Sequence, residues 1–476
     1  MTAGQHFDFL HTINGKPVAG PGRFGVINPA TAEVFAQAPE ATPELLQQAV
    51  DAATRAQPAW EAAGWDERAR RLLAFSADLE RHTDELAELL TLEQGKPLAE
   101  SKAEIAKSCD NLNKYAKQRI EPVVMRDDAN ERVEEHYRAA GVAGVISPWN
   151  TPLGLFAIRA APFLMSGSSV ISKPSPYTPL TTLRMGELSR AHFPAGVLNV
   201  IAGSDPLGQW VVEHPGVHRI SFTGSVRTGR KVLASGAEHL KRIALELGGN
   251  DPAIIFPDVN VKKIAPRLLW SVFRTCGQIC MTIKRLYVHE DIHEELTAEL
   301  IKLCSAIRVG DGMLPGIEMG PLQNRMQFDI VKRYLEETRA LPGTRVYGGE
   351  ILPGPGYFIS PAIVTHVPDD ARLVQEEQFG PVLPVLSFRD TEDVIQRANA
   401  TSYGLSASVW SNDTATATAV AKRIEAGTVW INNHMLLDPD VPFGGWKMSG
   451  IGRGNGLSGL QACMEAHAIR LLKQPV

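Results

Sequence analysis

The chain has 476 residues, more than one hydrophobic core normally serves, and its 44% hydrophobic and 21% charged residues are typical of a globular protein with about two or three domains. The formal net charge of −5 is small for this length, and lysine and arginine are spread among aspartate and glutamate. This pattern excludes nucleic acid and anionic membrane surfaces as expected partners. Residues 1–20 lack the pattern of a signal peptide, and no segment has the roughly twenty apolar residues of a membrane-spanning helix.

The first strongly patterned segment, residues 43–97, predicts amphipathic helices. Leucine, valine and alanine recur there at steps of three and four residues, which places them on one face of a helix. The second helix is expected to end at Gly95, because glycine can adopt the left-handed conformation that closes a helix. Pro97 then forbids its continuation.

After residue 138 the pattern changes to short runs rich in valine and isoleucine, separated by stretches long enough for a crossover helix. This alternation is typical of βαβ units around a parallel sheet. A second series of runs repeats it, and we place the boundary between two α/β domains near Leu247, where the rhythm restarts. The first series comprises residues 141–147, 169–172, 197–201, 219–222 and 252–256, and the second comprises 286–289, 344–346, 362–364, 382–386, 406–410 and 428–431.

Two turns at the ends of predicted strands could bind an anion. Gly224 and Ser225 follow the strand at 219–222 and open a helix, so backbone N–H groups and the positive end of the helix dipole would face a phosphate. Gly229 would let this helix lie close to the sheet. Lys173 ends another strand, where its ammonium could bind a ribose or a phosphate. The GxGxxG spacing is absent, so a simple glycine-containing turn and a surface lysine stay open as alternatives.

Three further residues suit a nucleophile, a base and an amide donor. Cys280 could supply a thiolate, which attacks an aldehyde carbon readily. Glu246 precedes two glycines that would let a large group approach, and Asn150 offers a side-chain NH2 to an oxyanion. The five cysteines are odd in number and sparse, which favours a reducing cytoplasm, and they lack the spacing and histidines of a zinc site, so no metal is expected. Each residue also has a structural explanation, and spacing alone does not bring the three together.

Seven motifs in order resemble those of the aldehyde dehydrogenase superfamily, and the resemblance covers essentially the whole chain. It implies an α/β fold of two Rossmann-like domains with parallel sheets and a small β oligomerisation element. The implied cofactor domain comprises residues 1–120 and 139–246, the catalytic domain 247–440, and the oligomerisation element 121–138 and 455–476, which would form a homodimer or homotetramer. The motifs are Pro148-Trp149-Asn150, Lys173-Pro174-Ser175, Phe222-Thr223-Gly224-Ser225, Glu246-Leu247-Gly248-Gly249-Asn250, Gly277-Gln278-Ile279-Cys280, Glu376-Glu377-Gln378-Phe379-Gly380-Pro381 and Pro442-Phe443-Gly444-Gly445.

The resemblance also implies a reaction, the NAD(P)-dependent oxidation of an aldehyde to a carboxylic acid. Cys280 would attack the aldehyde, the Asn150 side chain and the Cys280 N–H would hold the oxyanion, and hydride transfer would leave a thioester. Glu246 would activate the water that hydrolyses this thioester. NAD is the expected cofactor and NADP the alternative. The residues implied in binding it are Trp149, Lys173, Ser175, Gly208, Gly224, Ser225, Leu247, Glu377 and Phe379.

Three positions depart from the family pattern. Pro176 stands where many NAD-preferring members carry a glutamate that binds the ribose 2′-OH, so one barrier against a 2′-phosphate is missing. Arg159 and Gly454 stand where many members have a lysine and a glutamate along the proton path from the general base. Because arginine does not release its proton at ordinary pH, any relay must run through water or the backbone.

The positions that match the family's substrate tunnel are mostly apolar and suit an aliphatic or aromatic aldehyde. Arg274 would either favour an aldehyde that carries a carboxylate or phenolate or, as we expect of an arginine, face solvent or another subunit. Two alternatives keep the scaffold: a CoA-acylating dehydrogenase, which tends to lack a base such as Glu246, and a non-catalytic binding protein, which would have lost the thiol or the base. The tunnel positions are Thr151, Leu155, Ile158, Arg274, Met435 and Leu437.

Overall fold

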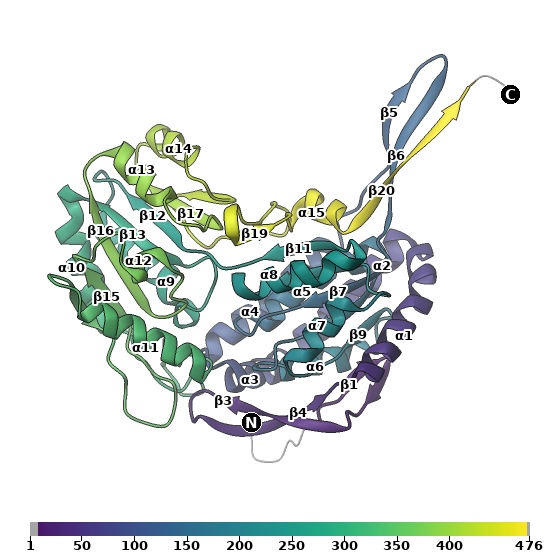
Figure 1. Cartoon of the computed structure of the whole chain (residues 1–476), viewed down its shortest axis with the longest axis horizontal. Helices are drawn as coiled ribbons and strands as arrows, with labels where there is room; N and C mark the ends of the chain where they lie inside the picture. The colour runs from purple at the N-terminus through teal and green to yellow at the C-terminus, as the bar shows by residue number, and fades with distance from the viewer. Residues whose placement is uncertain (1–7, 474–476) are drawn as a thin grey trace.

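Two α/β lobes lie side by side, and a narrow three-stranded arm projects from one of them (Figure 1). The structure is a computed structural model that describes residues 8–473. Residues 1–7, which belong to the predicted segments 1–20 and 1–120, and residues 474–476, which belong to 455–476, lie outside the described residues.

The first lobe is built on an eight-stranded sheet with the order β19-β11-β10-β7-β8-β9-β1-β2. The strands from β11 to β9 are parallel, as predicted, whereas β19, β1 and β2 add antiparallel edges that the sequence analysis did not anticipate. The bounds are β1 His11–Ile13, β2 Lys16–Val18, β7 Val142–Ile146, β8 Ser169–Lys173, β9 Leu198–Val200, β10 Arg219–Thr223, β11 Arg242–Glu246 and β19 Gly450–Ile451.

The helical segment at 43–97 contains three helices. We expected the second helix to end at Gly95, but the third one does. They are α1 (Pro43–Ala62), α2 (Gly64–Arg81) and α3 (Thr83–Gln94). The apolar spacing runs on across the breaks because all three helices bury leucines, and this hid the break at Gly64, whose φ is +80°. The predicted stop itself is confirmed, since Gly95 ends α3 with a φ of +96°.

The other helices of the first lobe cover both faces of its sheet (Figure 1). Glycine residues in this lobe allow close approach between layers; a Cβ on Gly229 of α8, for example, would lie 2.6 Å from the Leu247 side chain, as the prediction for this glycine required. The bounds are α4 Leu98–Tyr115, α5 Pro152–Ser166, α6 Leu180–Ser189, α7 Asp205–Glu213, α8 Val226–Gly236 and η1 Ala237–His239, with a separate hairpin of β3 Gly22–Asn28 and β4 Glu33–Glu40.

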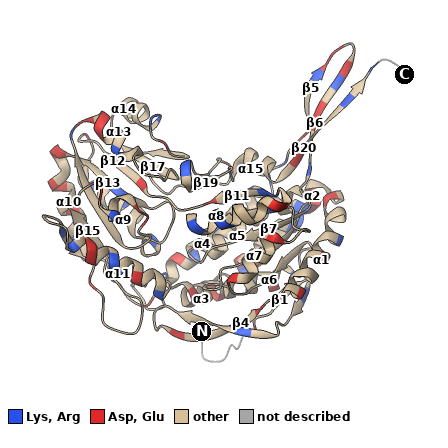
Figure 2. Cartoon of the chain, viewed as in Figure 1, with Lys and Arg blue, Asp and Glu red and all other residues tan. Residues whose placement is uncertain are grey.

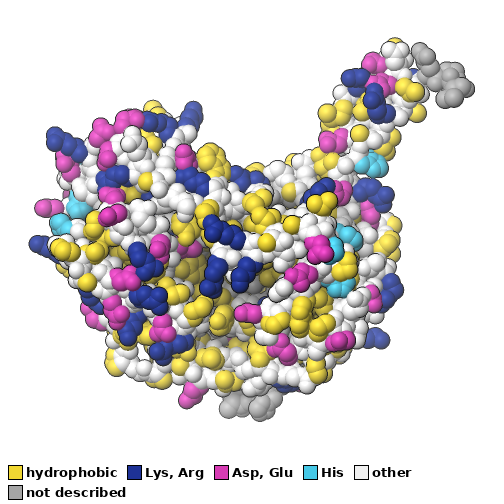
Figure 3. Space-filling view, viewed as in Figure 1, with side chains coloured by type: hydrophobic (Ala, Val, Ile, Leu, Met, Phe, Trp, Pro, Cys, Tyr) yellow, Lys and Arg dark blue, Asp and Glu magenta, His cyan; other side chains and the backbone are white. Residues whose placement is uncertain are grey.

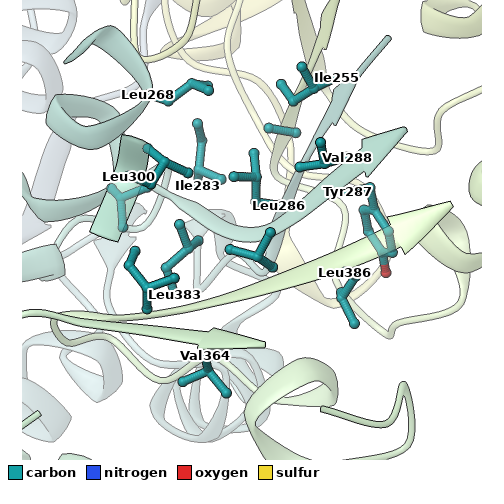
Figure 4. Close-up of a cluster of buried hydrophobic side chains, with 14 of the residues drawn as sticks. Ile255, Leu268, Ile283, Leu286, Tyr287, Val288, Leu300, Val364, Leu383 and Leu386 are labelled. Carbon is teal, nitrogen blue, oxygen red and sulfur yellow. The ribbon is translucent and has the colours of Figure 1, made fainter. Parts of the chain in front are cut away.

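The second lobe has a seven-stranded sheet with the order β14-β15-β16-β13-β12-β17-β18, parallel except for β14. Figure 4 shows its core, where Leu286 and Val288 of β13 and Leu383 of β16 are buried with Leu268 and Leu300 of the covering helices. The bounds are β12 Asp251–Ile255, β13 Ile283–His289, β14 Arg345–Gly348, β15 Ala362–Thr365, β16 Val382–Phe388, β17 Ser406–Trp410, β18 Thr428–Ile431, α9 Val261–Phe273, η2 Arg274–Gly277, α10 Glu290–Ser305, α11 Arg325–Arg339, α12 Arg372–Gln375, α13 Thr391–Asn399, α14 Thr414–Ala421 and η3 Lys447–Ser449.

The arm consists of β5 (Val123–Asp127), β6 (Glu131–Ala139) and β20 (Met464–Leu472), so the expected hairpin does pair with a C-terminal strand. Of the two elements in the described residues 455–473, β20 belongs to the arm, whereas α15 (Gly456–Ala462) buries Leu460 in the core of the first lobe. Acidic and basic residues are intermixed along the chain in both lobes (Figure 2). No helix in residues 8–473 is long and apolar enough to cross a membrane.

Candidate active site

A cavity of about 1690 Å³ is lined by residues of both lobes. Figure 3 shows the molecule hollowed between the lobes on the viewed face, with Lys and Arg side chains gathered beside the hollow over α8. Cys280, Glu246 and Asn150, which lie far apart in the sequence, all line this cavity. The nine predicted cofactor-binding residues line it as well: Trp149, Lys173, Ser175, Gly208, Gly224, Ser225, Leu247, Glu377 and Phe379.

Sheet register explains why the first-lobe residues converge. Lys173, the last residue of β8, pairs with Ile146 at the end of β7, and Thr223 of β10 pairs with Glu246 of β11. The carboxyl ends of these parallel strands therefore meet at one edge of the sheet, where open α/β sheets bind their ligands. The turn with Trp149 and Asn150 follows β7 at the same edge.

The loop that carries the nucleophile has an unusual backbone. Thr275, Cys276 and Gly277 have φ values of 52°, 58° and 70°, a left-handed turn that costs energy at the two non-glycine positions. A Cβ on Gly277 would lie 2.3 Å from the Gly380 carbonyl oxygen, so this position requires glycine. Glu100 of α4 stabilises the turn, because its Oε2 accepts hydrogen bonds from the Thr275 N–H (3.0 Å) and hydroxyl (2.9 Å).

Cys280 is half-buried in the cavity wall. Burial raises the pKa of its thiol, the Lys284 ammonium opposes this effect, and the carboxylates of Glu377, Asp251 and Glu246 add to it. The buried Lys284 Nζ donates hydrogen bonds to the Cys280 carbonyl oxygen (2.7 Å) and lies 3.8 Å from Glu377 Oε1. The thiol is therefore protonated at neutral pH in this state, and its activation requires a base.

The Asn150 side chain is fixed beside the nucleophile loop. Its Nδ2 donates a hydrogen bond to the Gln278 carbonyl oxygen (2.8 Å), which leaves a second N–H on the same nitrogen. The main-chain carbonyl oxygen of Asn150 accepts a hydrogen bond from the buried Lys96 Nζ (2.8 Å), whereas its side-chain Oδ1 has no hydrogen-bond partner within residues 8–473. Lys96 pairs with Glu104, whose other oxygen accepts from two N–H groups at the start of α5, both at 3.1 Å. This buried network fixes the turn that carries the amide.

Glu246 is buried and forms an ion pair with Arg159, with Oε1 and Nη2 3.4 Å apart. Burial raises the pKa of Glu246, and the positive charges of Arg159 and Arg453 lower it. Within residues 8–473, Glu246 Oε2 makes no hydrogen bond. A Cβ on Gly454 would lie 2.1 Å from Arg159 Nη1, so the guanidinium occupies the space of a side chain at 454. Arg159 and Gly454, which both depart from the family pattern, therefore depend on each other: the arginine fits because position 454 has no side chain.

The glycines after Glu246 admit protein groups. A Cβ on Gly248 would lie 2.0 Å from Glu377 Oε2, and a Cβ on Gly249 would lie 2.6 Å from the Cys280 carbonyl oxygen. The Gly249 N–H also donates to Glu377 Oε1 (3.1 Å). The two glycines therefore let Glu377 and the nucleophile loop lie directly against the end of β11.

The opposite end of the cavity has the properties of an anion site. Lys173 is buried, burial lowers the pKa of its ammonium to about 8, and it makes no hydrogen bond or ion pair within the described residues. Ser225 caps α8 by accepting a hydrogen bond from the Thr228 N–H (3.2 Å), which leaves further N–H groups at this helix start for a ligand. A buried cation without a partner beside a helix N-terminus fits a dinucleotide.

The remaining predicted cofactor contacts differ in their surroundings. The Trp149 and Phe379 rings meet edge to face, with centroids 5.4 Å apart, and Phe379 has a φ of 47°. Ser175 caps the following turn by accepting a hydrogen bond from the Tyr177 N–H (3.3 Å). Gly208 faces open space, because a Cβ there would meet no atom within 4 Å.

Sequence reasoning missed the buried charges that support the site, namely Lys96, Glu100, Glu104 and Lys284. A signal for α4 was present, since Glu100, Glu104, Lys107 and Asn111 recur at steps of three and four residues and all four line the cavity. Arg274 also lines the cavity and is half-buried, whereas we expected it to face solvent or another subunit.

The sequence model of the aldehyde dehydrogenase family matches residues 18–469. This chain belongs to the aldehyde dehydrogenase family. It is 37% identical over 473 residues to a betaine aldehyde dehydrogenase of Cereibacter sphaeroides, with 98% of each chain covered. The family resemblance and the expected α/β architecture are therefore confirmed.

Solved structures of other family members superpose closely on this chain. An NAD+ complex of an aldehyde dehydrogenase from Bacillus cereus has a TM-score of 0.96 and 35% identity, and the match covers 98% of this chain and 97% of the other. An NADP-dependent enzyme of E. coli has a TM-score of 0.95 and 35% identity, with 98% of each chain covered. The similar structures thus include an NAD+ complex and an NADP-dependent enzyme.

Proposed function

We propose that the protein oxidises an aldehyde to a carboxylic acid with NAD(P), through a thioester on Cys280. The observation that carries this proposal is that Cys280, Glu246 and Asn150 line one cavity with the unpaired cation Lys173. A binding protein on this scaffold would need none of the three catalytic side chains. A CoA-acylating enzyme would not need the buried carboxylate of Glu246, so neither alternative is favoured.

The residues divide the chemistry into two steps. In the first, a base removes the Cys280 proton and the sulfur bonds to the aldehyde carbon, while the free Asn150 N–H and the Cys280 N–H stabilise the oxyanion. A nicotinamide dinucleotide, when bound, would supply the acceptor for the aldehyde hydrogen and its electron pair. The acyl group then remains on Cys280 as a thioester.

In the second step, Glu246 takes a proton from water, which attacks the thioester carbon. The carbon–sulfur bond breaks, the carboxylic acid leaves, and Cys280 regains a proton. Glu246 suits this role because its Oε2 has no hydrogen-bond partner within residues 8–473, it lines the same cavity as Cys280, and its charge acts on the Cys280 thiol. The positive charge of Arg159 lowers the pKa of Glu246 against the effect of burial, but arginine cannot accept the proton, so that proton must leave through water or backbone groups.

Lys173, Ser175 and the start of α8 would hold the adenosine and pyrophosphate, and Glu377 and Phe379 the nicotinamide ribose and ring. In domain terms, the first lobe would bind the cofactor and the second would supply the nucleophile. We propose NAD as the preferred cofactor. NADP stays open, because Pro176 offers no carboxylate against a 2′-phosphate and two exposed cavity-lining cations, Arg227 and Lys231, form no ion pair within residues 8–473.

We further propose that the arm mediates a homodimer or homotetramer. Its strands expose apolar side chains, among them Met125 at 64% and Leu472 at 67%, which a free arm would leave in water. A reducing compartment such as the cytoplasm suits a chain whose five cysteines are all free and whose chemistry needs a thiol.

The test is formation of reduced nicotinamide, followed by its absorbance, with a panel of aldehydes, both cofactors, and CoA present or absent. Cys280→Ala should abolish turnover and leave cofactor binding measurable. Cys276→Ser, which changes the buried thiol four residues earlier, is the matched control and should stay active. Oxidation of aldehydes by Cys280→Ala, or turnover that depends on CoA, would reject the proposal.

A further inference from the structure

Arg274 is a cation without an anionic partner in the wall of the catalytic cavity. It lies in η2, six residues before the nucleophile in sequence, and its guanidinium stacks on the Trp270 ring at 4.9 Å from the centroid. Within residues 8–473 it forms neither a hydrogen bond nor an ion pair, although it is half-buried and guanidinium carries five N–H donors. Such a group has unused capacity for an anion.

The neighbours of Arg274 are already committed elsewhere. Arg267 stacks on the same Trp270 ring, at 4.4 Å, and donates its hydrogen bonds to Asn433 and the His434 carbonyl oxygen. Glu100 is the carboxylate whose charge interacts with Arg274, but burial raises its pKa and its Oε2 is bound by Thr275. Two guanidinium groups thus share one indole without a carboxylate bonded to either.

Three other cations that line the cavity are each paired with a carboxylate. Lys96 pairs with Glu104, Arg159 with Glu246, and the exposed Lys107 with Asp110 at 2.7 Å. Arg274 is therefore the cation without an ion pair among these, although the charge of Glu100 also acts on it. A cationic aldehyde bound beside Arg274 would be repelled by this like charge.

The rest of this wall is largely apolar. Leu155, Ile158, Met435 and Leu437 also line the cavity. A ligand that fits these groups has an aldehyde, a hydrocarbon spacer and a negative end.

We propose that the substrate is an aldehyde with a carboxylate at its far end, an ω-oxo carboxylic acid, and that Arg274 binds this carboxylate. This inference rests on the proposed function and specifies its substrate class. The left-handed turn at 275–277 and its two hydrogen bonds to Glu100 fix the backbone from which Arg274 projects. Arg274 is thus a preorganised specificity residue, and it takes no part in the chemistry at the thioester carbon.

The experiment compares three aldehydes of similar length: 5-oxopentanoate, pentanal and the cationic betaine aldehyde. Wild type should have the highest kcat/KM with the oxo acid and the lowest with the cation. Arg274→Gln should raise KM for 5-oxopentanoate by about 10- to 100-fold, the range for a lost charge-assisted hydrogen bond, with kcat little changed and pentanal affected less than about twofold. Arg274→Lys should recover part of the loss, and Lys107→Gln, which removes another cavity-lining cation, should change KM much less.

A binding measurement separates this inference from the proposed reaction. Glutarate, which has two carboxylates and no aldehyde, should slow alkylation of Cys280 by iodoacetamide in wild type but not in Arg274→Gln. Equal protection in both proteins, or an equal KM change for the oxo acid and pentanal, would overturn the assignment of Arg274. If protection depends on Arg274 but no aldehyde is oxidised, the anion site stands and the proposed reaction fails.

Discussion

The Arg159–Glu246 pair makes the strongest quantitative prediction. At 3.4 Å, two unit charges at an effective dielectric constant of about 20 attract by about 5 kcal/mol, which is an upper estimate for this pair. Loss of even about 1.4 kcal/mol of this attraction changes the ratio of ionised to protonated carboxyl about tenfold. Arg159→Gln should therefore slow thioester hydrolysis on the acidic side of the pH profile, by up to about tenfold for each ~1.4 kcal/mol of attraction that is lost.

The sign follows from the two opposing effects on Glu246. Burial raises its pKa and Arg159 lowers it, so removal of the guanidinium lets the pKa rise and protonates the base. The acidic limb of the kcat profile should move to higher pH, and activity should recover as the pH increases. The rapid first turnover should persist as a burst of reduced cofactor, because acylation precedes the step that is slowed.

Two variants serve as controls for the fold and the charge. Arg159→Lys keeps a cation and should move the acidic limb less. Gly454→Ala leaves Arg159 in the sequence but places a Cβ where Nη1 now lies, so it should displace the guanidinium and shift the limb in the same direction as Arg159→Gln. An unmoved acidic limb in Arg159→Gln, in a protein that still shows the burst, would refute this account of Glu246.

The other predictions concern stability and cofactor choice. Glu104→Gln leaves Lys96 buried without its counterion and should lower the free energy of unfolding by about 3 to 5 kcal/mol, seen as a lower thermal midpoint. The double variant Lys96→Met with Glu104→Leu, which replaces the ion pair by an apolar pair, should lose less stability. An equal loss in both variants would contradict this prediction. Burial lowers the pKa of His434 from 6.5 to about 3. Between these two pH values only the unfolded chain binds the proton, so the stability of the fold decreases as the pH is lowered. His434→Gln should remove about 2 kcal/mol of the pH 7 to pH 5 loss in denaturant titrations, and an unchanged loss would show that other groups cause it. Replacing Arg227 and Lys231 with alanine should raise KM for NADP more than for NAD, and equal changes would exclude a 2′-phosphate contact.

Much of the fold was readable from local pattern, because parallel buried strands are short apolar runs and Gly95 stops a helix by its own conformation. The antiparallel edges could not be read in this way. β19 has two residues, and its pairing with β11 depends on contacts between positions about two hundred residues apart. The N-terminal strands β1 and β2 are three residues each, too short for a periodic signal.

The candidate site divides in the same manner. Cys280, Glu246 and Asn150 came from motifs, and the cavity brings them together. The side chains that position them are charged residues in the interior, and composition predicts such residues on the surface. Lys284 illustrates this, because only the fold shows that its ammonium contacts the Cys280 carbonyl oxygen. We predicted that Arg274 faces solvent or another subunit because most arginines are exposed. That average carries no information about the conformation of a particular loop.

The pairing of β19 with β11 has a consequence for biosynthesis. Gly450 lies opposite Glu246 in this pairing, so the strand that bears the base gains its outer neighbour only after nearly the entire polypeptide has left the ribosome. The second lobe, encoded between these two positions, can complete its own sheet earlier. A nascent or truncated chain that ends before residue 450 would thus expose an open strand edge beside its base, which makes it a natural target for chaperones and quality-control proteases.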